Sequence, residues 1–157
     1  MTANSFTQSF IVDQPPEAVS VAISNPRAWW SESIEGSTDR VGATWHYQFR
    51  DIHSCTIKVT EMQPGRIAWH VLANDFNFIT DKTEWVDTRI VFDITPKGEA
   101  TEVRFTHVGL VPDYECYEVC ENAWGTYIAS LNSLIATGAG FPNVGEPITA
   151  GEKAHVA

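Results

Sequence analysis

The most reactive side chain expected to face the interior is His107, which lies in a segment of alternating polar and apolar residues. An imidazole can act near neutral pH as an acid, a base or a ligand donor. Two interpretations stay open: a hydrogen bond to a carbonyl of a strand or helix start, or direct contact with a bound molecule. If the chain is a cavity enzyme of cyclase, dehydratase or hydrolase type, we expect His107 to be its acid or base, with Tyr47 or Tyr117 as hydrogen-bond partner. Other catalytic residues are unknown.

Cys55, Cys116 and Cys120 form the second reactive group. Together with His107 they offer thiolate and imidazole ligands of the kind that zinc prefers. Cys116 and Cys120 lack the C-x2-C spacing of structural zinc sites, and their spacing on a helix gives poor disulfide geometry. We therefore expect free thiols that behave as small hydrophobic residues, and we expect neither a metal nor a cofactor.

Three glutamates, Glu115, Glu118 and Glu121, raise the alternative of paired carboxylates for acid and base catalysis. They lie at the start of a predicted helix, where the helix dipole favours negative charge. We interpret them as solvated charges.

Aromatic residues are the most abundant candidates for binding, and they include Trp45, Tyr47, Trp69, Trp85, Trp124 and Tyr127. Aromatic side chains fill hydrophobic cores, and they also line pockets for planar or apolar ligands, which tyrosine hydroxyls can orient. Inward positions look alike whether an interior is packed or hollow, so the sequence leaves both interpretations open. Residues 74–85, rich in Asp and Phe, are expected to form an exposed edge loop that gates the interior.

The elements that position these residues begin with a strand at residues 6–12. Pro15 and Pro16 then favour a helix start, and Pro26 both ends this helix and starts a second helical turn that carries Trp29 and Trp30. The sequence therefore predicts two short helices after the first strand.

Period-two alternation predicts five further strands, at residues 43–50, 54–62, 66–72, 88–95 and 101–107. Because successive side chains of a strand point to opposite faces, the alternation also assigns an inward face. The inward positions are Trp45, Tyr47, Phe49, Cys55, Ile57, Val59, Ile67, Trp69, Val71, Ile90, Phe92, Ile94, Val103, Phe105 and His107. One apolar and one polar face indicate an antiparallel sheet covered by helices on a single side.

The spacing of apolar residues predicts a long amphipathic helix over residues 113–138, with a length of about 39 Å if all of them are helical. Gly138 is a suitable C-cap, and residues 139–157 contain glycines and prolines without periodicity. We expect one domain over residues 1–138 and a C-terminal loop or tail over residues 139–157.

Composition restricts the class of protein. The chain has 157 residues, of which 43% are hydrophobic and 19% charged, with a formal net charge of -10. An acidic chain with few basic residues is a poor candidate for binding nucleic acid or anionic membranes. We expect neither partner, and without a signal-peptide pattern or an apolar run of spanning length we expect a cytoplasmic location.

The order of these elements and several short motifs resemble the START/Bet v 1-like (SRPBCC) superfamily. The motifs are residues 12–19, Trp29-Trp30, Val41-Gly42, residues 64–66 with Trp69, residues 83–85, residues 101–110, and residues 115–120 with Trp124. The resemblance is greatest to the bacterial branch named after the activator of the heat-shock-protein-90 ATPase. It implies an α+β helix-grip fold: a curved antiparallel sheet of six or seven strands around a long C-terminal helix, with a cavity between them.

The resemblance and the face assignment together predict binding of a small hydrophobic or aromatic molecule in that cavity, rather than catalysis. The residues expected to line it are Tyr47, Cys55, Trp69, Phe92, Phe105, His107, Tyr117, Cys120 and Trp124. The alternatives are the cavity enzyme and a co-chaperone-like interaction module with an acidic surface. A homodimer and a chaperone partner both stay open.

Overall fold

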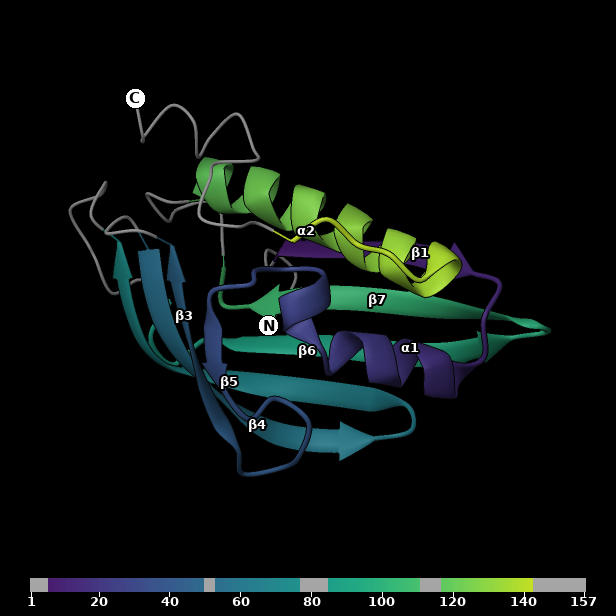
Figure 1. The fold of residues 1–157 in the computed structure, drawn as a ribbon, viewed down its shortest axis with the longest axis horizontal. Coiled ribbons are helices and arrows are strands. Elements are labelled where there is room, and N and C mark those ends of the chain that lie inside the picture. The colour runs from purple at the N-terminus through teal and green to yellow at the C-terminus, as the bar shows by residue number, and fades with distance from the viewer. Residues whose placement is uncertain (1–5, 50–52, 77–84, 111–116, 143–157) are drawn as a thin grey trace.

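The computed structural model describes residues 6–49, 53–76, 85–110 and 117–142 (Figure 1). Within these ranges the chain forms an α+β fold of seven strands, two α-helices and one short 3-10 helix. The elements are β1 (Phe6–Val12), α1 (Pro16–Ile23), η1 (Pro26–Ala28), β2 (Ile34–Gly36), β3 (Thr44–Phe49), β4 (His53–Gln63), β5 (Arg66–Phe76), β6 (Arg89–Lys97), β7 (Ala100–Val108) and α2 (Tyr117–Thr137).

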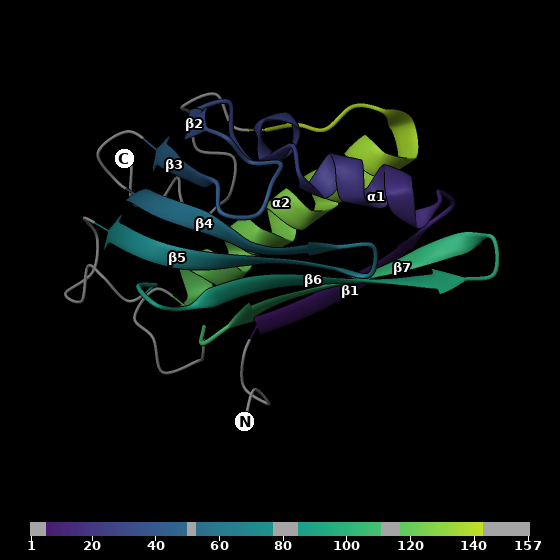
Figure 2. The ribbon, with the colours of Figure 1, turned by 90° about the horizontal axis from the view of Figure 1, so that it is seen from below.

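The strands form one antiparallel sheet in the order β1-β7-β6-β5-β4-β3-β2. Its register shifts between Thr56 and Ile57 of β4 and again between Val59 and Glu61. Such irregularities bend and twist a strand. The sheet is curved, and α1 and α2 lie together on its concave side (Figure 2). The helix-grip architecture expected from the sequence is therefore confirmed.

Both short helices begin at a proline residue. Pro15 is the extended N-cap of α1 and Pro16 its first residue, and Glu17 places negative charge in the first turn. The helix buries Val19, Ala22 and Ile23, and Ser24 is its C-cap. The second helical segment, η1, is a single turn, and Trp29 and Trp30 follow it as buried residues.

Helix α2 is described from Tyr117, and the predicted residues 113–116 lie outside the described ranges. Its buried apolar positions follow helical spacing and are Cys120, Trp124, Tyr127, Ile128, Leu131 and Ile135. The Gly138 N–H closes the helix by donating to the Leu134 carbonyl oxygen at 2.9 Å. The chain then turns back along α2 (Figure 1), where the Phe141 N–H donates to Ser130 Oγ at 2.7 Å.

The predicted inward face of the sheet is confirmed, because every one of its fifteen positions is buried. The predicted strand ends differ from the observed ones by at most four residues, and β2 was not predicted at all. This strand is only three residues long, too short to show alternation.

The expectation of an exposed loop at residues 74–85 is wrong at both ends. Strand β5 continues to Phe76, Asn74 is buried within it, and Trp85 is only 3% exposed. Residues 77–84 lie outside the described ranges. The error arose because the polar residues of the segment were interpreted without the long-range contacts that bury its ends.

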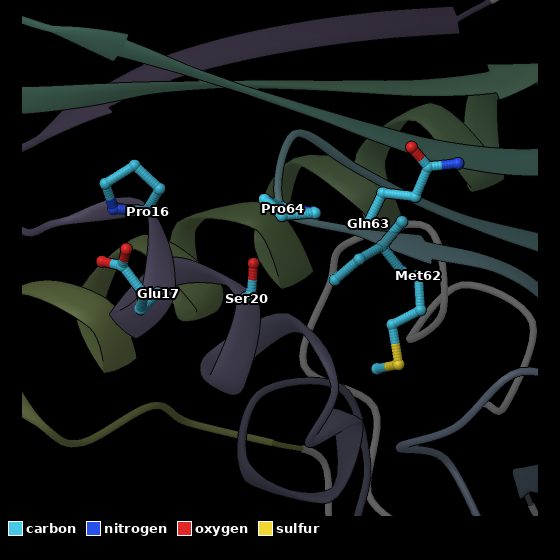
Figure 3. Close-up of a pocket in the computed structure, with 7 residues that line it drawn as sticks. Pro16, Glu17, Ser20, Met62, Gln63 and Pro64 are labelled. Carbon is cyan, nitrogen blue, oxygen red and sulfur yellow. The ribbon is translucent and has the colours of Figure 1, made fainter.

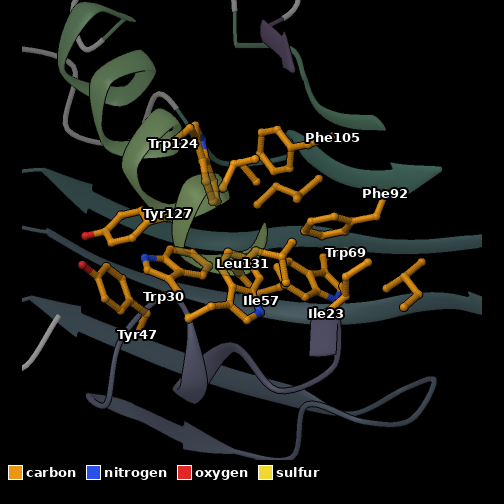
Figure 4. Packing of buried hydrophobic residues seen from close by; sticks show 14 of the residues in the cluster. Ile23, Trp30, Tyr47, Ile57, Trp69, Phe92, Phe105, Trp124, Tyr127 and Leu131 are labelled. Atoms are coloured by element: carbon orange, nitrogen blue, oxygen red, sulfur yellow. The ribbon is translucent and has the colours of Figure 1, made fainter. Parts of the chain in front are cut away.

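The core lies between the sheet and the helices and consists largely of aromatic side chains (Figure 4). Its largest fully buried members are Trp29, Trp30, Trp45, Trp69, Trp124, Tyr47, Phe49, Phe92 and Phe105. None of the helices in the described part of the chain is long and apolar enough to cross a membrane.

Candidate functional site

The nine residues expected to line a cavity come from five strands and one helix, and the fold turns most of them toward the space between α2 and the sheet. Tyr47, Cys55, Trp69, Phe92, Phe105, His107, Cys120 and Trp124 are buried, and Tyr117 is half-buried against the core. Their common orientation follows from strand alternation and from helical spacing in α2.

A chain of ring contacts joins four of these residues across the sheet. Trp69 and Phe92 have ring centroids 5.0 Å apart, and Phe92 and Phe105 lie 5.3 Å apart. Phe105 then meets Trp124 of α2 at 4.6 Å. The contacts are edge-to-face or tilted, which the charge distribution of aromatic rings favours.

Trp30, which was not among the predicted lining residues, connects this series of ring contacts to Tyr47. Its ring lies 4.8 Å from Tyr47 and 5.1 Å from Trp124, measured between centroids. Trp30 follows η1 rather than a strand, so alternation could not reveal its direction. The adjacent pair Trp29-Trp30 after Pro26 was the available signal.

Both ring nitrogens of His107 are engaged in hydrogen bonds. The Trp124 indole N–H donates to His107 Nδ1 at 3.1 Å, so Nδ1 carries no proton and the proton of the neutral ring is on Nε2. His107 Nε2 lies 2.8 Å from Thr88 Oγ1, which donates its own proton to the Trp85 carbonyl oxygen at 2.6 Å. Thr88 therefore accepts from His107, and the three bonds connect α2, β7 and the start of β6.

The environment of His107 keeps its imidazole neutral. Complete burial, and to a lesser degree the nearby His53, lower its pKa to about 3. A histidine acting as an acid or base near pH 7 needs a pKa close to that value and a free nitrogen. The geometry therefore favours a structural role for His107, in which it orients Trp124.

Gly109 allows Thr88 to approach the end of β7. A Cβ at this position would lie 2.9 Å from Thr88 Cγ2, and the backbone has a φ of 101°. Few residues other than glycine accept that conformation. The next residue, Leu110, donates its N–H to the His107 carbonyl oxygen at 3.1 Å, which completes a tight turn beside the site.

His53 and Asn74 form a polar pair at the same end of the core, and neither was predicted as a site residue. His53 Nε2 lies 2.8 Å from Asn74 Oδ1. Burial lowers the pKa of His53 to about 4, although the Asn74 hydrogen bond opposes this effect. The Trp85 ring separates the two histidines, with centroids 4.8 Å from His53 and 4.7 Å from His107.

The cysteines and Tyr117 contribute little reactivity. Burial raises the pKa of the Cys55 thiol, which disfavours the thiolate that would act as a nucleophile or metal ligand. Cys120 is buried, and Cys116 lies outside the described ranges. Burial, the negative charge of Glu121 and a hydrogen bond to it raise the pKa of Tyr117. Within the described residues, no group of three or more His, Cys, Asp or Glu side chains could hold a metal ion.

Three indole N–H groups in the centre of the core have no hydrogen-bond acceptor within the described part of the chain. They belong to Trp30, Trp45 and Trp69, each at most 1% exposed. The Trp45 ring lies 5.5 Å from Trp30 and 5.1 Å from Trp69. By contrast, Trp29 donates to the Ala22 carbonyl oxygen at 3.1 Å. A buried donor without an acceptor costs roughly 1–3 kcal/mol.

The donor of Trp30 lies at the polar end of the aromatic cluster. Figure 4 shows its indole nitrogen at the same end as the hydroxyl groups of Tyr47 and Tyr127. The centroids of Trp30 and Tyr127 are 6.0 Å apart. Apolar side chains with a few polar groups at one end are the usual lining of a small-molecule site.

Hollows also lie on the surface around α1. One of about 320 Å³ separates α1 from the turn between β4 and β5 (Figure 3). It is lined by Pro16, Glu17, Ser20, Met62, Gln63, Pro64 and Ile67. No residue of the predicted site lines it, so it is separate from the aromatic cluster.

Residues 13–136 match the family described as activator of Hsp90 ATPase homolog 1-like protein. The chain belongs to this family. The match covers most of the described fold, from the end of β1 to the end of α2, and confirms the superfamily resemblance inferred from the sequence. No curated protein matches the chain.

Several solved structures are similar to this protein in fold. The Aha1 dimer from Colwellia psychrerythraea is 23% identical, with a TM-score of 0.70 over 87% of this chain and 98% of the other. DynU16, from the dynemicin biosynthetic locus, is 17% identical with a TM-score of 0.64 over 87% of this chain and 49% of DynU16. CalU16 from Micromonospora echinospora is 15% identical, with a TM-score of 0.59 over 85% and 77%. The chain thus spans about half the length of DynU16.

Proposed function

We propose that this protein binds a small, predominantly apolar or aromatic molecule between α2 and the sheet. The observation that carries the proposal is the buried indole N–H of Trp30, which has no acceptor within the described residues and lies beside Tyr47 and Tyr127. A bound molecule with one acceptor oxygen would remove the cost of this unpaired donor. The family supports the proposal, because its fold commonly encloses a ligand cavity.

The chemistry around the cluster favours an uncharged ligand. The nearby His53 and His107 are neutral, and aromatic rings supply most of the surface. A charged carboxylate or ammonium would lose its hydration here without a compensating ion. A planar molecule with a carbonyl, ether or phenolic oxygen fits the donors and the rings better.

Binding requires some of the aromatic rings to separate. Trp30 contacts Tyr47, Trp45 and Trp124 at centroid distances of 4.8, 5.5 and 5.1 Å, so these side chains occupy the space between them. A rotation of Trp30 would open a space next to the polar end. Ligand binding should therefore change the intrinsic tryptophan fluorescence and the near-ultraviolet circular dichroism.

The test uses two probes that differ in one oxygen, 1-tetralone and tetralin. We expect 1-tetralone to quench tryptophan fluorescence saturably and to bind at least about tenfold more tightly than tetralin, which is about 1.4 kcal/mol. Trp30→Phe should remove this preference, because phenylalanine keeps an aromatic ring but has no N–H. Equal affinity of the wild-type protein for both probes would contradict the role of Trp30.

Two measurements complete the test. Trp29→Phe is the matched control, since the Trp29 N–H is already bonded to Ala22 and should not affect the preference between the probes. Native and denaturing mass spectra of the purified protein would show a copurified ligand as extra mass lost on unfolding. Absence of both probe binding and extra mass would remove the support for a ligand site.

A protein-interaction module is a second candidate function, favoured by the net charge of -10 and by the close packing of the interior. Such a module would bind a basic surface of its partner, and the family description points to a chaperone. Association should then weaken as salt is added, because salt screens attraction between opposite charges. Association that does not depend on salt would contradict this candidate.

We also propose that this protein forms a homodimer, because the similar Colwellia protein is described as a dimer. We further propose a cytoplasmic protein whose ligand site is complete within residues 1–138. The last point can be tested by truncating the chain after residue 138 and repeating the probe titration. Loss of binding with a native circular dichroism spectrum would show that the removed residues contribute.

A further inference from the structure

The outer edge of β1 is a sheet edge with which no strand of the described residues pairs. Strands β1 and β2 are the two ends of the sheet, and β2 has only three residues. Natural proteins protect their edges with short strands, charges, prolines or bulges. Strand β1 has seven residues, with the sequence FTQSFIV, and contains no charged residue, proline or glycine. Only the β2 edge is therefore protected by shortness.

The backbone groups that face outward can be assigned. The Phe6 N–H donates to the Leu110 carbonyl oxygen at 2.9 Å, on the side of β7. In an antiparallel sheet, successive residues direct their N–H and C=O groups to opposite neighbours. Residues 6, 8, 10 and 12 therefore face β7, while Thr7, Ser9 and Ile11 direct their backbone groups to the open edge.

The side chains at this edge suit pairing with another strand. Thr7, Ser9 and Ile11 are exposed, and the apolar side chain of Ile11 is 62% exposed. The half-buried Phe10 packs against the core from the opposite face of the strand. Threonine and isoleucine are β-branched and form favourable cross-strand pairs.

We propose that the outer edge of β1 binds the same edge of a second copy of this chain. The two strands run antiparallel about a twofold axis at Ser9, so that Ser9 lies opposite the partner's Ser9 and Thr7 opposite the partner's Ile11. This register uses every outward N–H and C=O of the three residues, which gives about six backbone hydrogen bonds. The same surface on both copies closes the pair as a dimer and joins the two sheets.

The absence of charge on β1 favours a second copy over a charged peptide. Two highly acidic molecules repel each other, and a neutral strand is where they can approach most closely. Pairing of a single strand buries less than the roughly 800 Å² per partner of a standard interface. We therefore expect a weak dimer in rapid exchange with the monomer.

The test is sedimentation velocity of the full chain at increasing concentration, with three variants. Ser9→Lys places two positive charges opposite each other at the axis. Ser9→Pro removes an outward N–H but keeps the ladder with β7, because the Ser9 N–H does not face β7. Thr95→Lys, at an exposed position of β6, is the control with the same change in charge.

We expect the wild-type protein and T95K to dimerise with similar affinity, and S9K and S9P to dimerise at least about tenfold more weakly. If S9P loses its native circular dichroism spectrum, S9K alone decides. A wild-type protein that stays monomeric up to about 1 mM would overturn both the self-association and its surface. Dimers of S9K as strong as those of the wild type would overturn the surface alone. Neither result depends on ligand binding.

Discussion

His107 shows how a buried environment can convert a titratable side chain into a structural one. Its two nitrogens join Trp124 of α2 to Thr88, which lies immediately before β6. Removing one partner of a buried hydrogen bond leaves the other without compensation. Loss of the imidazole should therefore lower the stability of the fold and change the orientation of Trp124.

We predict that His107→Leu lowers the free energy of unfolding by about 2–4 kcal/mol, because the Trp124 N–H loses its acceptor inside the core. Urea unfolding followed by tryptophan fluorescence measures this change. His46→Leu is the control, since His46 is exposed on β3, and it should shift stability by less than about 0.5 kcal/mol. A H107L variant as stable as H46L would contradict the structural role.

The two histidines with lowered pKa values, His53 and His107, also predict how stability depends on pH. Their pKa values are lowered from 6.5 to about 4 at His53 and about 3 at His107, so below pH 6.5 the unfolded chain binds protons that the folded chain does not. Stability should be greatest above pH 6.5 and should fall as the pH decreases toward 4 and then 3. Between pH 7 and 5 each histidine contributes a loss of up to roughly 2 kcal/mol, less at the half-buried His53.

Urea titrations at pH 7 and pH 5 test this prediction. His53→Gln should remove part of the difference between the two pH values, since glutamine does not titrate. Equal stability of the wild-type protein at pH 7 and pH 5 would show that the histidines are protonated in the folded state.

The sequence was sufficient to predict that His107 and the aromatic residues face the interior. It was not sufficient to predict their hydrogen-bond and ring-contact partners. Alternation depends only on neighbouring residues in one strand, whereas Thr88 and Trp124 lie 19 and 17 residues away from His107. For the same reason it could not show that Trp85 is stacked on Trp124, with centroids 5.7 Å apart. Whether the predicted lining residues bind a ligand stays a prediction.

At the scale of elements, regular patterns predicted the sheet and the long helix, and irregular segments were harder. Strands β6 and β7 alternate clearly, so their faces were predicted correctly. The three residues of β2 and the continuation of β5 to Phe76 depend on pairing with neighbouring strands. Local sequence gives little information about such pairing.

Two glycines at α2 should respond in opposite ways to substitution by alanine. A Cβ at Gly140 would meet the Ala28 carbonyl oxygen and would lie 3.0 Å from Ser130 Oγ, whereas a Cβ at Gly125 has no neighbour within 4 Å. Gly140→Ala should destabilise the fold by about 1–2 kcal/mol through displacement of residues 139–142 from α2. Gly125→Ala, inside the helix, should stabilise it by roughly 0.5–1 kcal/mol.

Thermal unfolding of the two variants and the wild type measures whether each substitution raises or lowers stability. A midpoint that falls for G140A and rises for G125A would support the described packing of the chain after Gly138. If G140A were as stable as the wild type, the close approach to Ala28 would not contribute to stability. If G125A were destabilised, the open space beside Gly125 would be contradicted.

At the scale of the whole molecule, two kinds of association should respond to salt in opposite ways. One is pairing of two copies of this acidic protein through the neutral β1 edge, and the other is binding to a basic partner. The net charge of -10 makes two copies repel each other, and salt screens that repulsion over a length of about 10 Å at 0.1 M. Pairing through β1 should therefore strengthen at higher ionic strength. Binding to a basic partner should weaken under the same conditions, because there the screened force is attractive.

We predict that the dimer dissociation constant of the wild-type protein decreases several-fold between about 20 and 300 mM sodium chloride, as measured by sedimentation velocity. The direction of the change is decisive, because hydrogen bonds between uncharged backbone groups depend little on salt while repulsion between the acidic bodies does. A dimer that weakens with added salt would instead be held by ion pairs. The neutral β1 edge contains no charged residue to form them, so another surface would have to be responsible.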